Sequence, residues 1–299
     1  MLRDFNDLRA KLAKNSKKTI AVAAAQDLHT LEAVFDAEKE FGVDYILTGN
    51  KEEILAVCKR IGHVIDEEKI ISANTEEEAA FEAVSLIRNK RADILMKGKL
   101  QTATLLKAVL NKETGIREGS VMSHMAVLEC LGHDRLIFMT DGGMLPYPDL
   151  VQKRGILENG VSFMHSLGYK EPNVAVLAAV ETISDKMPET VDAAELSKLN
   201  AQGEITGCIV EGPLSFDLAV SPESAAIKGI QSQVSGNADM LLVPNISTGN
   251  IMSKALLFLG GAKMAGCVLG AKVPIVLVSR GATAEEKKLS ILMCLCSQK

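Results

Sequence analysis

The sequence predicts an α/β protein of two domains, each built around a mainly parallel β-sheet. Short runs of β-branched residues alternate with segments of helical period along most of the 299-residue chain, and this alternation is typical of successive βα units. The length exceeds what one hydrophobic core usually serves, since a domain takes roughly 150 residues. Two domains with a cleft between them are therefore expected.

In the first half of the chain, strands and helices are expected to alternate regularly. Most of the strands end in small or polar residues just before a helix begins, which places ligand-binding groups at the C-terminal ends of the strands. The expected strands are 19–26, 45–50, 69–74 and 92–98, and the expected helices are 27–41, 51–61 and 75–89.

The pattern changes after residue 119. The strand-like runs 120–130 and 134–143 are separated only by Leu131-Gly132-His133, too short a link for a parallel crossover, so this pair should be antiparallel. The run EGPLSF is expected to break at Pro213. The remaining expected elements are strands 173–181, 207–216, 240–245 and 267–279, and helices 149–167, 188–202 and 248–263.

The domain boundary is placed near the Gly-rich, charged segment 115–119. The last strand is interrupted at Gly270-Ala271-Lys272-Val273-Pro274, which suits a crossover, so it and the final helix should return to the first domain. We therefore expect residues 1–117 plus 270–299 to form the first α/β domain and residues 118–269 to form the second.

Composition and charge exclude several classes of protein. Hydrophobic residues make up 47% and charged residues 24% of the chain, as in ordinary globular proteins. The net charge of −5 and the absence of Trp argue against nucleic-acid binding. The longest apolar runs, such as 174–180, fall well short of the ~20 residues that cross a bilayer, and the charged amphipathic start has no signal-peptide core. A cytoplasmic protein without membrane or nucleic-acid partners is expected.

Common cofactor and metal motifs are missing. The chain has no GxGxxG, GxxxxGK[ST], HExxH or GxSxG pattern, which removes the usual support for dinucleotide, P-loop, zinc-protease and serine-hydrolase functions. Its six cysteines stand in apolar contexts without zinc-ligand spacing, so buried, reduced thiols are expected.

The stretch VLVSRGATAEEKKLSI is the main candidate for chemistry. Ser279 and Arg280 end an apolar strand, and the helix that starts near Thr283 directs its free N–H groups to the same place. A hydroxyl, a guanidinium and a helix N-terminus together favour a phosphate or oxyanion cradle. Alternatively, Thr283 and Glu286 have the spacing of a capping box, and Arg280 pairs only with Glu285.

A second candidate group follows the strand 92–98. Lys97 and Lys99 flank a glycine at a strand-to-helix turn, with Thr102 and Lys107 on the next helix. Such cations could meet the phosphates of a nucleotide-like ligand. The alternative is that these lysines are ordinary solvated surface residues.

Further candidates lie in the second half of the chain. Ser123 and His124 interrupt an apolar strand, and alternation puts them on opposite faces, so at most one points into a cleft; His124 is either a packing residue or an acid–base group. Asp217 is expected to begin a helix after one strand, and Gly249 and Asn250 to enter a helix after another, where helix capping alone could also explain them.

Taken together, several strings resemble the phosphate acetyl/butyryltransferase family, and most closely its butyryl-transferring branch. The likeness runs over nearly the whole chain, and the motifs are specific only in combination. They are LMKGKLQTATLLKAVLNKETGIREG, MSHMAVLE, KMPETVDAAELSKLNAQGEITGCIVEGPLSFDLAVS, ADMLLVPNISTGNI and PIVLVSRGATAEEK.

The resemblance implies a fold and an activity. The fold would be a two-domain, three-layer αβα architecture like that of isocitrate and isopropylmalate dehydrogenases, with the active site in the interdomain cleft. The activity would be reversible transfer of a short-chain, butyryl-like acyl group between coenzyme A and inorganic phosphate, by direct transfer in a ternary complex. Coenzyme A and phosphate would be substrates, with no metal or redox cofactor, and the protein would be a homo-oligomer.

The resemblance also implies roles for residues. Arg280 would hold the phosphate and Ser279 would stabilise the charged transition state. The acetyl-specific relatives have an aspartate where this chain has Glu286, as base for the coenzyme A thiol, whereas butyryl-type sequences keep the acid at Glu285, so both are candidates. Lys107 stands where those relatives have arginine. The substrate- or coenzyme A-binding candidates are Lys97, Lys99, Thr102, Lys107, Ser123, His124, Asp217, Gly249 and Asn250.

Three alternatives stay open at the level of sequence. The chain could have acetyl-type specificity. It could be a metal- and NAD-dependent decarboxylating dehydrogenase of the same fold, although no two of its aspartates are four positions apart, as the metal ligands of that class often are. It could also be a non-catalytic acyl-CoA binding module.

Overall fold

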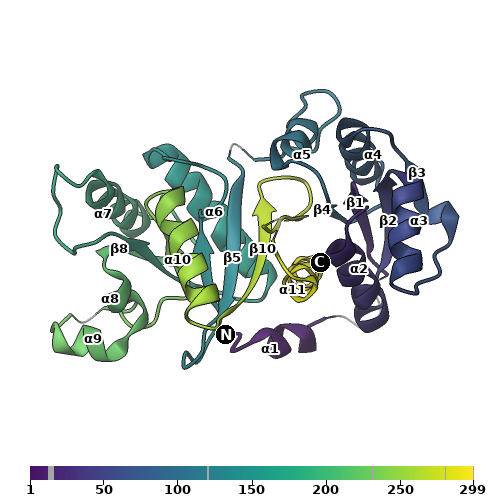
Figure 1. Ribbon diagram of the computed structural model, residues 1–299. Helices are drawn as coiled ribbons and strands as arrows, with labels where there is room; N and C mark the ends of the chain where they lie inside the picture. Colours follow the sequence, from purple (N-terminus) through teal and green to yellow (C-terminus); the bar gives the residue numbers. More distant parts are fainter. Residues whose placement is uncertain (13–16, 120, 231, 280, 299) are drawn as a thin grey trace. The chain divides into compact units, whose positions relative to one another are not determined.

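The chain folds into alternating strands and helices, which confirms the predicted α/β class. The computed structural model in Figure 1 describes all residues except 13–16, 120, 231, 280 and 299. Its contacts divide the chain into two compact units. Unit 1 comprises Met1–Asp7 and Val121–Met264, and unit 2 comprises Leu8–Ser120 and Ala265–Lys299.

The strands of unit 2 form a mainly parallel sheet. Across the sheet they are β3 (Ile70–Ser72), β2 (Asp44–Gly49), β1 (Thr19–Ala23), β4 (Ile94–Lys97), β11 (Ile275–Val276) and β10 (Lys263–Leu269), most of which belongs to this unit. Among the strand pairs that the described residues of this unit form, β10–β11 alone is antiparallel. The carboxyl ends of β1, β2, β4 and β11 therefore meet at one edge.

Three helices of unit 2 begin at side-chain caps of residue types that favour this position. Asp27, Asn50 and Thr75 each accept a hydrogen bond from the backbone N–H three residues further on. The expected helices 27–41, 51–61 and 75–89 differ from the observed ones by at most one residue at either end. The helices are α2 (Leu28–Phe41), α3 (Lys51–Arg60), α4 (Glu76–Arg88), α5 (Thr102–Val109) and α11 (Ala284–Cys296), and the short α1 (Phe5–Ala10) contains the division between the units.

Among the strands of unit 1, one antiparallel pair joins a set of parallel strands. Ala126 pairs with Met139 and Val127 with Phe138, antiparallel as predicted, and the other pairs are parallel. In order across the sheet the strands are β5 (Ser123–Glu129), β6 (Ile137–Thr140), β9 (Met240–Leu242), β7 (Asn173–Leu177) and β8 (Ile209–Leu214).

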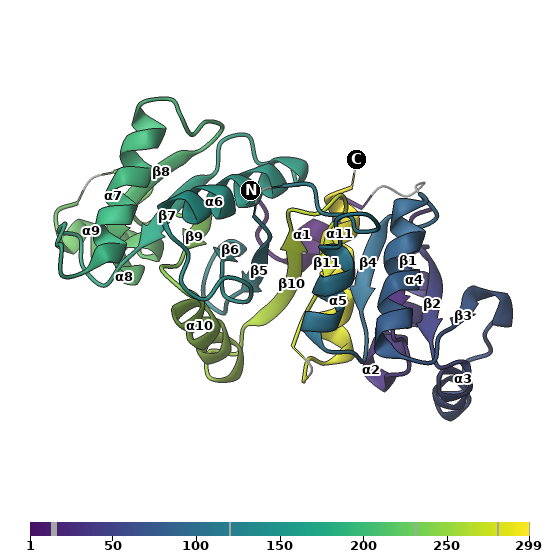
Figure 2. The ribbon, with the colours of Figure 1, turned by 90° about the horizontal axis from the view of Figure 1, so that it is seen from above.

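Helices cover both faces of the unit 1 sheet. A Cβ atom at Gly160 of α6 would lie 2.5 Å from Met240 Sδ and 3.0 Å from Met125 Cε, so α6 packs closely on that face. Ala126 and Leu241, which follow Met125 and Met240 in the sequence, point to the opposite face and belong to a core cluster there. Residues of α8, α9 and α10 pack in or against this cluster, and these helices lie on that side of the strands (Figure 2). The helices are α6 (Leu150–Ser166), α7 (Pro188–Ala201), α8 (Phe216–Val220), α9 (Pro222–Ile227) and α10 (Ile246–Phe258).

Three expectations about element boundaries are wrong. Pro213 does not end its strand, because β8 is at the edge of the sheet, where a missing N–H donor is tolerated. Helix α10 ends at Phe258 before Gly260 and Gly261, the latter with φ of 64°, and Lys263 begins β10 instead of ending a helix. The single strand expected at 267–279 is two antiparallel strands, β10 and β11.

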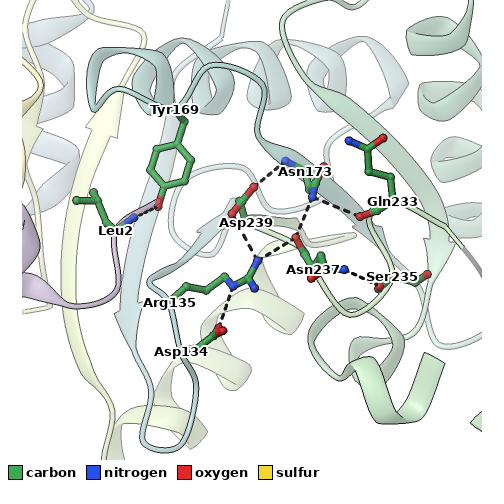
Figure 3. A network of polar contacts seen from close by, with 9 residues as sticks. All are labelled: Leu2, Asp134, Arg135, Tyr169, Asn173, Gln233, Ser235, Asn237 and Asp239. Carbon is green, nitrogen blue, oxygen red and sulfur yellow. Dashed lines mark hydrogen bonds and ion pairs between the residues drawn. The ribbon is translucent and has the colours of Figure 1, made fainter. Parts of the chain in front are cut away.

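A polar network joins the amino ends of β6, β7 and β9 in unit 1 (Figure 3). Asp239 Oδ2 accepts a hydrogen bond from Asn173 N at 2.9 Å, and Oδ1 lies 4.0 Å from Arg135 Nη1. Arg135 also bonds Asp134 at 3.0 Å. Burial raises the pKa of Asp239, against the opposing effects of Asn173 and Arg135. Within unit 1, this network lies at the opposite ends of the strands from Asp141 and Asp217, which follow the carboxyl ends of β6 and β8.

Candidate active site

Two candidate residues of unit 2 lie at the carboxyl ends of neighbouring strands, one at the end of β4 and one shortly after β11. Val276 pairs with Met96, so Lys97 and Leu277 come next along the same edge, and Ser279 follows two residues later. Lys97 is only 6% exposed, and its ammonium donates to Gly98 O at 3.3 Å. Ser279 is exposed. The parallel pairing thus brings a buried cation and an exposed hydroxyl to one edge of the sheet.

The turn after β4 requires its glycine. A Cβ atom at Gly98 would lie 2.2 Å from Ala24 O, because the backbone crosses directly beside β1, where Lys99 N bonds the same oxygen at 2.7 Å. The Lys99 side chain is exposed. Thr102 opens α5, and Lys107 lies exposed in its last turn.

The start of α11 is the capping box that the spacing predicts. Glu286 Oε2 accepts hydrogen bonds from Thr283 N at 2.8 Å and from Thr283 Oγ1 at 3.0 Å, and Thr283 Oγ1 accepts from Glu286 N at 3.2 Å. Glu285 instead pairs with Lys288 at 2.9 Å, and Lys288 also bonds Glu40. Arg280 lies outside the described residues, so its expected roles stay predictions.

A buried lysine lies one position after the capping glutamate. Lys287 is 5% exposed, and its ammonium lies 3.7 Å from Asp27 Oδ2. Asp27 is the N-cap of α2 and also accepts from Thr30. The pKa of Asp27 is lowered, because these hydrogen bonds and the Lys287 charge together outweigh its burial, which acts in the opposite direction. This ion pair links the first turn of α11 to the start of α2.

In unit 1 the candidates Ser123 and His124 lie on opposite faces of β5, as alternation predicts. Ser123 is fully buried, and its hydroxyl accepts a hydrogen bond from Asn159 Nδ2 at 3.1 Å. His124 is partly exposed. Of the two, only His124 presents part of its surface to solvent.

His124 meets the loop after β6, which the sequence analysis did not single out. A Cβ atom at Gly143 would lie 2.9 Å from His124 Cγ, so the ring packs against this glycine. Asp141 begins the loop, is 2% exposed, and accepts hydrogen bonds from the N–H groups of Gly143, Met144 and Leu145. The sequence feature that could have indicated this loop is an aspartate directly after a buried strand, followed by two glycines.

The same loop meets the start of α10. A Cβ atom at Gly249 would lie 2.7 Å from Gly142 Cα, and Asn250 Nδ2 lies 3.4 Å from Gly142 O. The structure therefore brings His124, Gly249 and Asn250 together around Gly142 and Gly143. Their proximity agrees with a shared role.

Asp217 makes its polar contacts in a different group. Lys228 lies 3.1 Å from Asp217 and 3.2 Å from Glu181, and it donates to Ser215 Oγ at 3.3 Å. Hydrogen bonds from Ser215 and Lys228 lower the pKa of Asp217. This group lies after β7 and β8.

In the part of the chain that the structure describes, no group of three or more His, Cys, Asp or Glu side chains is arranged to hold a metal ion. All six cysteines are free thiols; four are buried, as predicted, whereas Cys130 and Cys296 are partly exposed. No helix among these residues is both long and apolar enough for a membrane span.

Comparison with known proteins decides the family. Residues 57–294 match the model of the phosphate acetyl/butaryl transferase family. The chain belongs to this family. The resemblance drawn from its motifs, and the predicted class of enzyme, a phosphate acyltransferase, are thereby confirmed.

Relatives of this family match the chain over nearly its full length. A phosphate butyryltransferase of Clostridium acetobutylicum is 44% identical over 98% of this chain and 97% of its own. A phosphate acetyltransferase of Thermotoga maritima is 41% identical over 97% of this chain and 98% of its own. The crystal structure of a branched-chain phosphotransacylase from Enterococcus faecalis is 33% identical, with a TM-score of 0.84 over 94% of this chain and 98% of that one. Identity alone does not separate acetyl from butyryl relatives.

Proposed function

We propose that this phosphate acyltransferase moves a short-chain, butyryl-like acyl group reversibly between coenzyme A and inorganic phosphate, by direct transfer in a ternary complex. The observation that carries the proposal is the grouping of candidate residues at the carboxyl ends of the unit 2 strands. There the buried Lys97 ends β4, Ser279 follows the neighbouring β11, and the capped start of α11 comes next. Cations, a hydroxyl and helix N–H groups are the donors that a phosphate requires.

Arg280 is proposed to bind the phosphate. In the direction of acyl-CoA synthesis, the coenzyme A sulfur attacks the acyl phosphate carbonyl, a new C–S bond forms, and the C–O bond to phosphate breaks. Negative charge grows on the carbonyl oxygen and then on the leaving phosphate. The Arg280 guanidinium and the Ser279 hydroxyl would stabilise that charge, and each donor supplies about 3 kcal/mol in a water-excluded site.

Of the two proposed bases, we favour Glu286. A thiol with a pKa of ~8.5 is mostly protonated at neutral pH, so a carboxylate that accepts its proton assists attack. The capping hydrogen bonds to Glu286 use Oε2, which orients the carboxylate and leaves Oε1 outside them. Glu285, in contrast, points to Lys288 in a partly exposed ion pair.

The remaining candidate residues, some in unit 1 and some in unit 2, are proposed to bind the rest of the substrate. His124, Gly249 and Asn250 gather around one loop, and Lys99, Thr102, Lys107, Ser123 and Asp217 complete the proposed set. Ser123 would act from within the strand, through its bond to Asn159. The predicted domains, 1–117 plus 270–299 and 118–269, with an isocitrate dehydrogenase-like layout and a cleft between them, belong to the same proposal.

We also propose a cytoplasmic homo-oligomer that needs no cofactor beyond its two substrates. Support for association comes from α10, which keeps large apolar side chains in solvent. Ile251 is 68% exposed, Phe258 76% and the adjoining Leu259 90%. Association with a second copy that covers these side chains would lower the free energy, because it removes apolar surface from water.

The proposal is tested by thiol release from acetyl-, butyryl- and longer acyl-CoA in the presence of phosphate. We expect the highest kcat/KM with butyryl-CoA. A preference for acetyl-CoA would assign acetyl-type specificity instead. Binding of coenzyme A without thiol release would indicate a binding module, and reduction of NAD by a hydroxy acid would indicate a dehydrogenase.

Arg280→Ala tests the site itself. It should raise the KM for phosphate, whereas Arg154→Ala should not, because Arg154 pairs with Glu158 on the surface of α6. Normal phosphate dependence of Arg280→Ala would refute the site assignment. Isolation of an acyl-enzyme after incubation with an acyl phosphate would refute direct transfer.

A further inference from the structure

The carboxylate of Asp141 is buried, and both of its oxygens accept hydrogen bonds from the loop that follows it. It is 2% exposed, and its two oxygens accept from Gly143 N at 2.8 Å, Met144 N at 2.9 Å and Leu145 N at 3.1 Å. Burial raises the pKa of Asp141, although these three bonds and the nearby His124 act in the opposite direction. Burial of a carboxylate costs free energy unless hydrogen bonds replace its lost hydration, and here the three N–H groups of the loop supply those bonds.

What these bonds hold in place is the contact surface of three proposed binding residues. Gly143 supports the His124 ring, since a Cβ atom there would lie 2.9 Å from His124 Cγ. Gly142 lies against the first turn of α10, where a Cβ atom on it would be 3.0 Å from Gly249 C. Asn250 Nδ2 lies 3.4 Å from Gly142 O.

We infer that Asp141 is a positioning residue of the acyl transfer reaction, which fixes the 142–145 loop so that His124, Gly249 and Asn250 share one substrate-binding surface. The inference rests on the proposed function, because it assumes that these three residues contact substrate. Asp141 itself acts through them. The contacts are tight enough that a shift of a few tenths of an ångström in the loop moves both the ring and the helix.

Unit 1 offers a matched control in Asp239 (Figure 3). Asp239 is also buried, at 8% exposure, and it too accepts a backbone hydrogen bond, from Asn173 N. It precedes β9, which pairs with β6, but at the amino end, whereas Asp141 follows the carboxyl end of β6. Replacement of either aspartate removes a buried charge, and only one of the two supports the proposed binding surface.

The experiment compares Asp141→Asn with Asp239→Asn at a temperature where both variants are folded. An asparagine at 141 can still accept from Gly143 and Met144, but its amide NH₂ cannot accept from Leu145. We expect kcat/KM to fall by about tenfold to a hundredfold, chiefly through KM for acyl-CoA or phosphate. Asp239→Asn should stay within about twofold of the unmodified enzyme, as a change away from the site does.

Hydrogen exchange supplies a readout that does not depend on activity. The segments 142–145 and 246–252 should exchange faster in Asp141→Asn, and both should be unchanged in Asp239→Asn. The inference is overturned if the two variants have the same kinetics, or if the 142–145 amides of Asp141→Asn stay fully protected. A lack of thiol release by the unmodified enzyme would instead overturn the proposed function.

Gly142→Ala covers the case in which Asp141→Asn does not fold. The added Cβ presses on the Gly249 backbone without removing any charge. It should give the same rise in KM, with exchange accelerated at the start of α10. Normal KM values in this variant would contradict the inference.

Discussion

Thr283 and Glu286 bond to each other in both directions at the start of α11, backbone to side chain each way. The glutamate that the family resemblance names as a base is therefore also the residue that caps its own helix. The two roles are compatible, since the cap takes Oε2 and fixes the direction of the carboxylate. They also make separate predictions.

Glu286→Gln should keep the cap and lose the base. Glutamine retains an oxygen that accepts from Thr283 N, so the unfolding midpoint should barely change. It takes no proton from the thiol, so kcat should fall by about 10²- to 10⁴-fold. Steady-state kinetics and thermal unfolding on one preparation test both statements.

Two control variants complete that comparison. Glu285→Gln removes only the ion pair with Lys288, so kcat should change little; a loss as large as that of Glu286→Gln would move the base to Glu285. Thr283→Val removes the cap, which should lower the free energy of unfolding by about 1 kcal/mol.

Local sequence predicted much of unit 2. Asp27, Asn50 and Thr75 cap their helices through the N–H three residues on, and the Thr283–Glu286 box needs only three-residue spacing. These contacts form within one turn of chain, so residue type and position suffice to predict them. The antiparallel β5–β6 pair followed in the same way from its short link.

Features that depend on distant partners escaped prediction. Pro213 stays in β8 because that strand is at the edge of its sheet, which the sequence does not reveal. Ser123 is held by Asn159, 36 positions away. Asp141 bonds its own loop, but its burial and its relation to His124 and Gly249 arise only when β5, β6 and α10 pack together. The candidate site was predicted residue by residue, and its grouping was not.

The Asp27–Lys287 ion pair should contribute to stability mainly by compensating the buried charge of Lys287. Asp27→Asn keeps a good N-cap for α2 but leaves the Lys287 ammonium buried without that charge, so the free energy of unfolding should fall by about 1–3 kcal/mol. Adding Lys287→Met should restore much of this loss, because a buried apolar side chain then replaces a buried charge.

A double-mutant cycle by urea unfolding measures that coupling. Additive effects of the two substitutions would show that the 3.7 Å contact contributes nothing. Asp192→Asn serves as a comparison, since it breaks the contact of 2.6 Å with the similarly buried Lys153 in unit 1.

Asp239 predicts a sign for the dependence of stability on pH. Its pKa in the fold is raised above the ordinary 3.8, so the folded state holds this proton to a higher pH than the unfolded chain does. Its contribution to stability is therefore greatest at or below 3.8, and it declines as the pH rises from there through the raised value. Asp239→Asn lacks this decline.

The measurement is the difference in urea midpoint between the unmodified protein and Asp239→Asn from pH 4 to pH 7. The urea midpoint of the unmodified protein should fall relative to that of the variant as the pH rises, because only the unmodified protein must ionise a buried carboxyl at this position. A difference that is constant, or that grows in the opposite direction, would show that Arg135 and Asn173 fully offset the effect of burial.

The apolar surface of α10 predicts how copies of the chain associate. A lysine at Ile251 or Phe258 would place a charge in an interface that a second copy covers, and the loss of that apolar contact should shift the protein toward a monomer. Val64, which is 95% exposed in unit 2, provides a matched apolar-to-charged control as Val64→Lys. Sedimentation velocity should give an oligomer for the unmodified protein and for Val64→Lys, and a smaller species for Ile251→Lys and Phe258→Lys. If those two variants sediment like the unmodified protein, the oligomer forms through another surface. If the unmodified protein is itself a monomer, the proposed homo-oligomer is refuted.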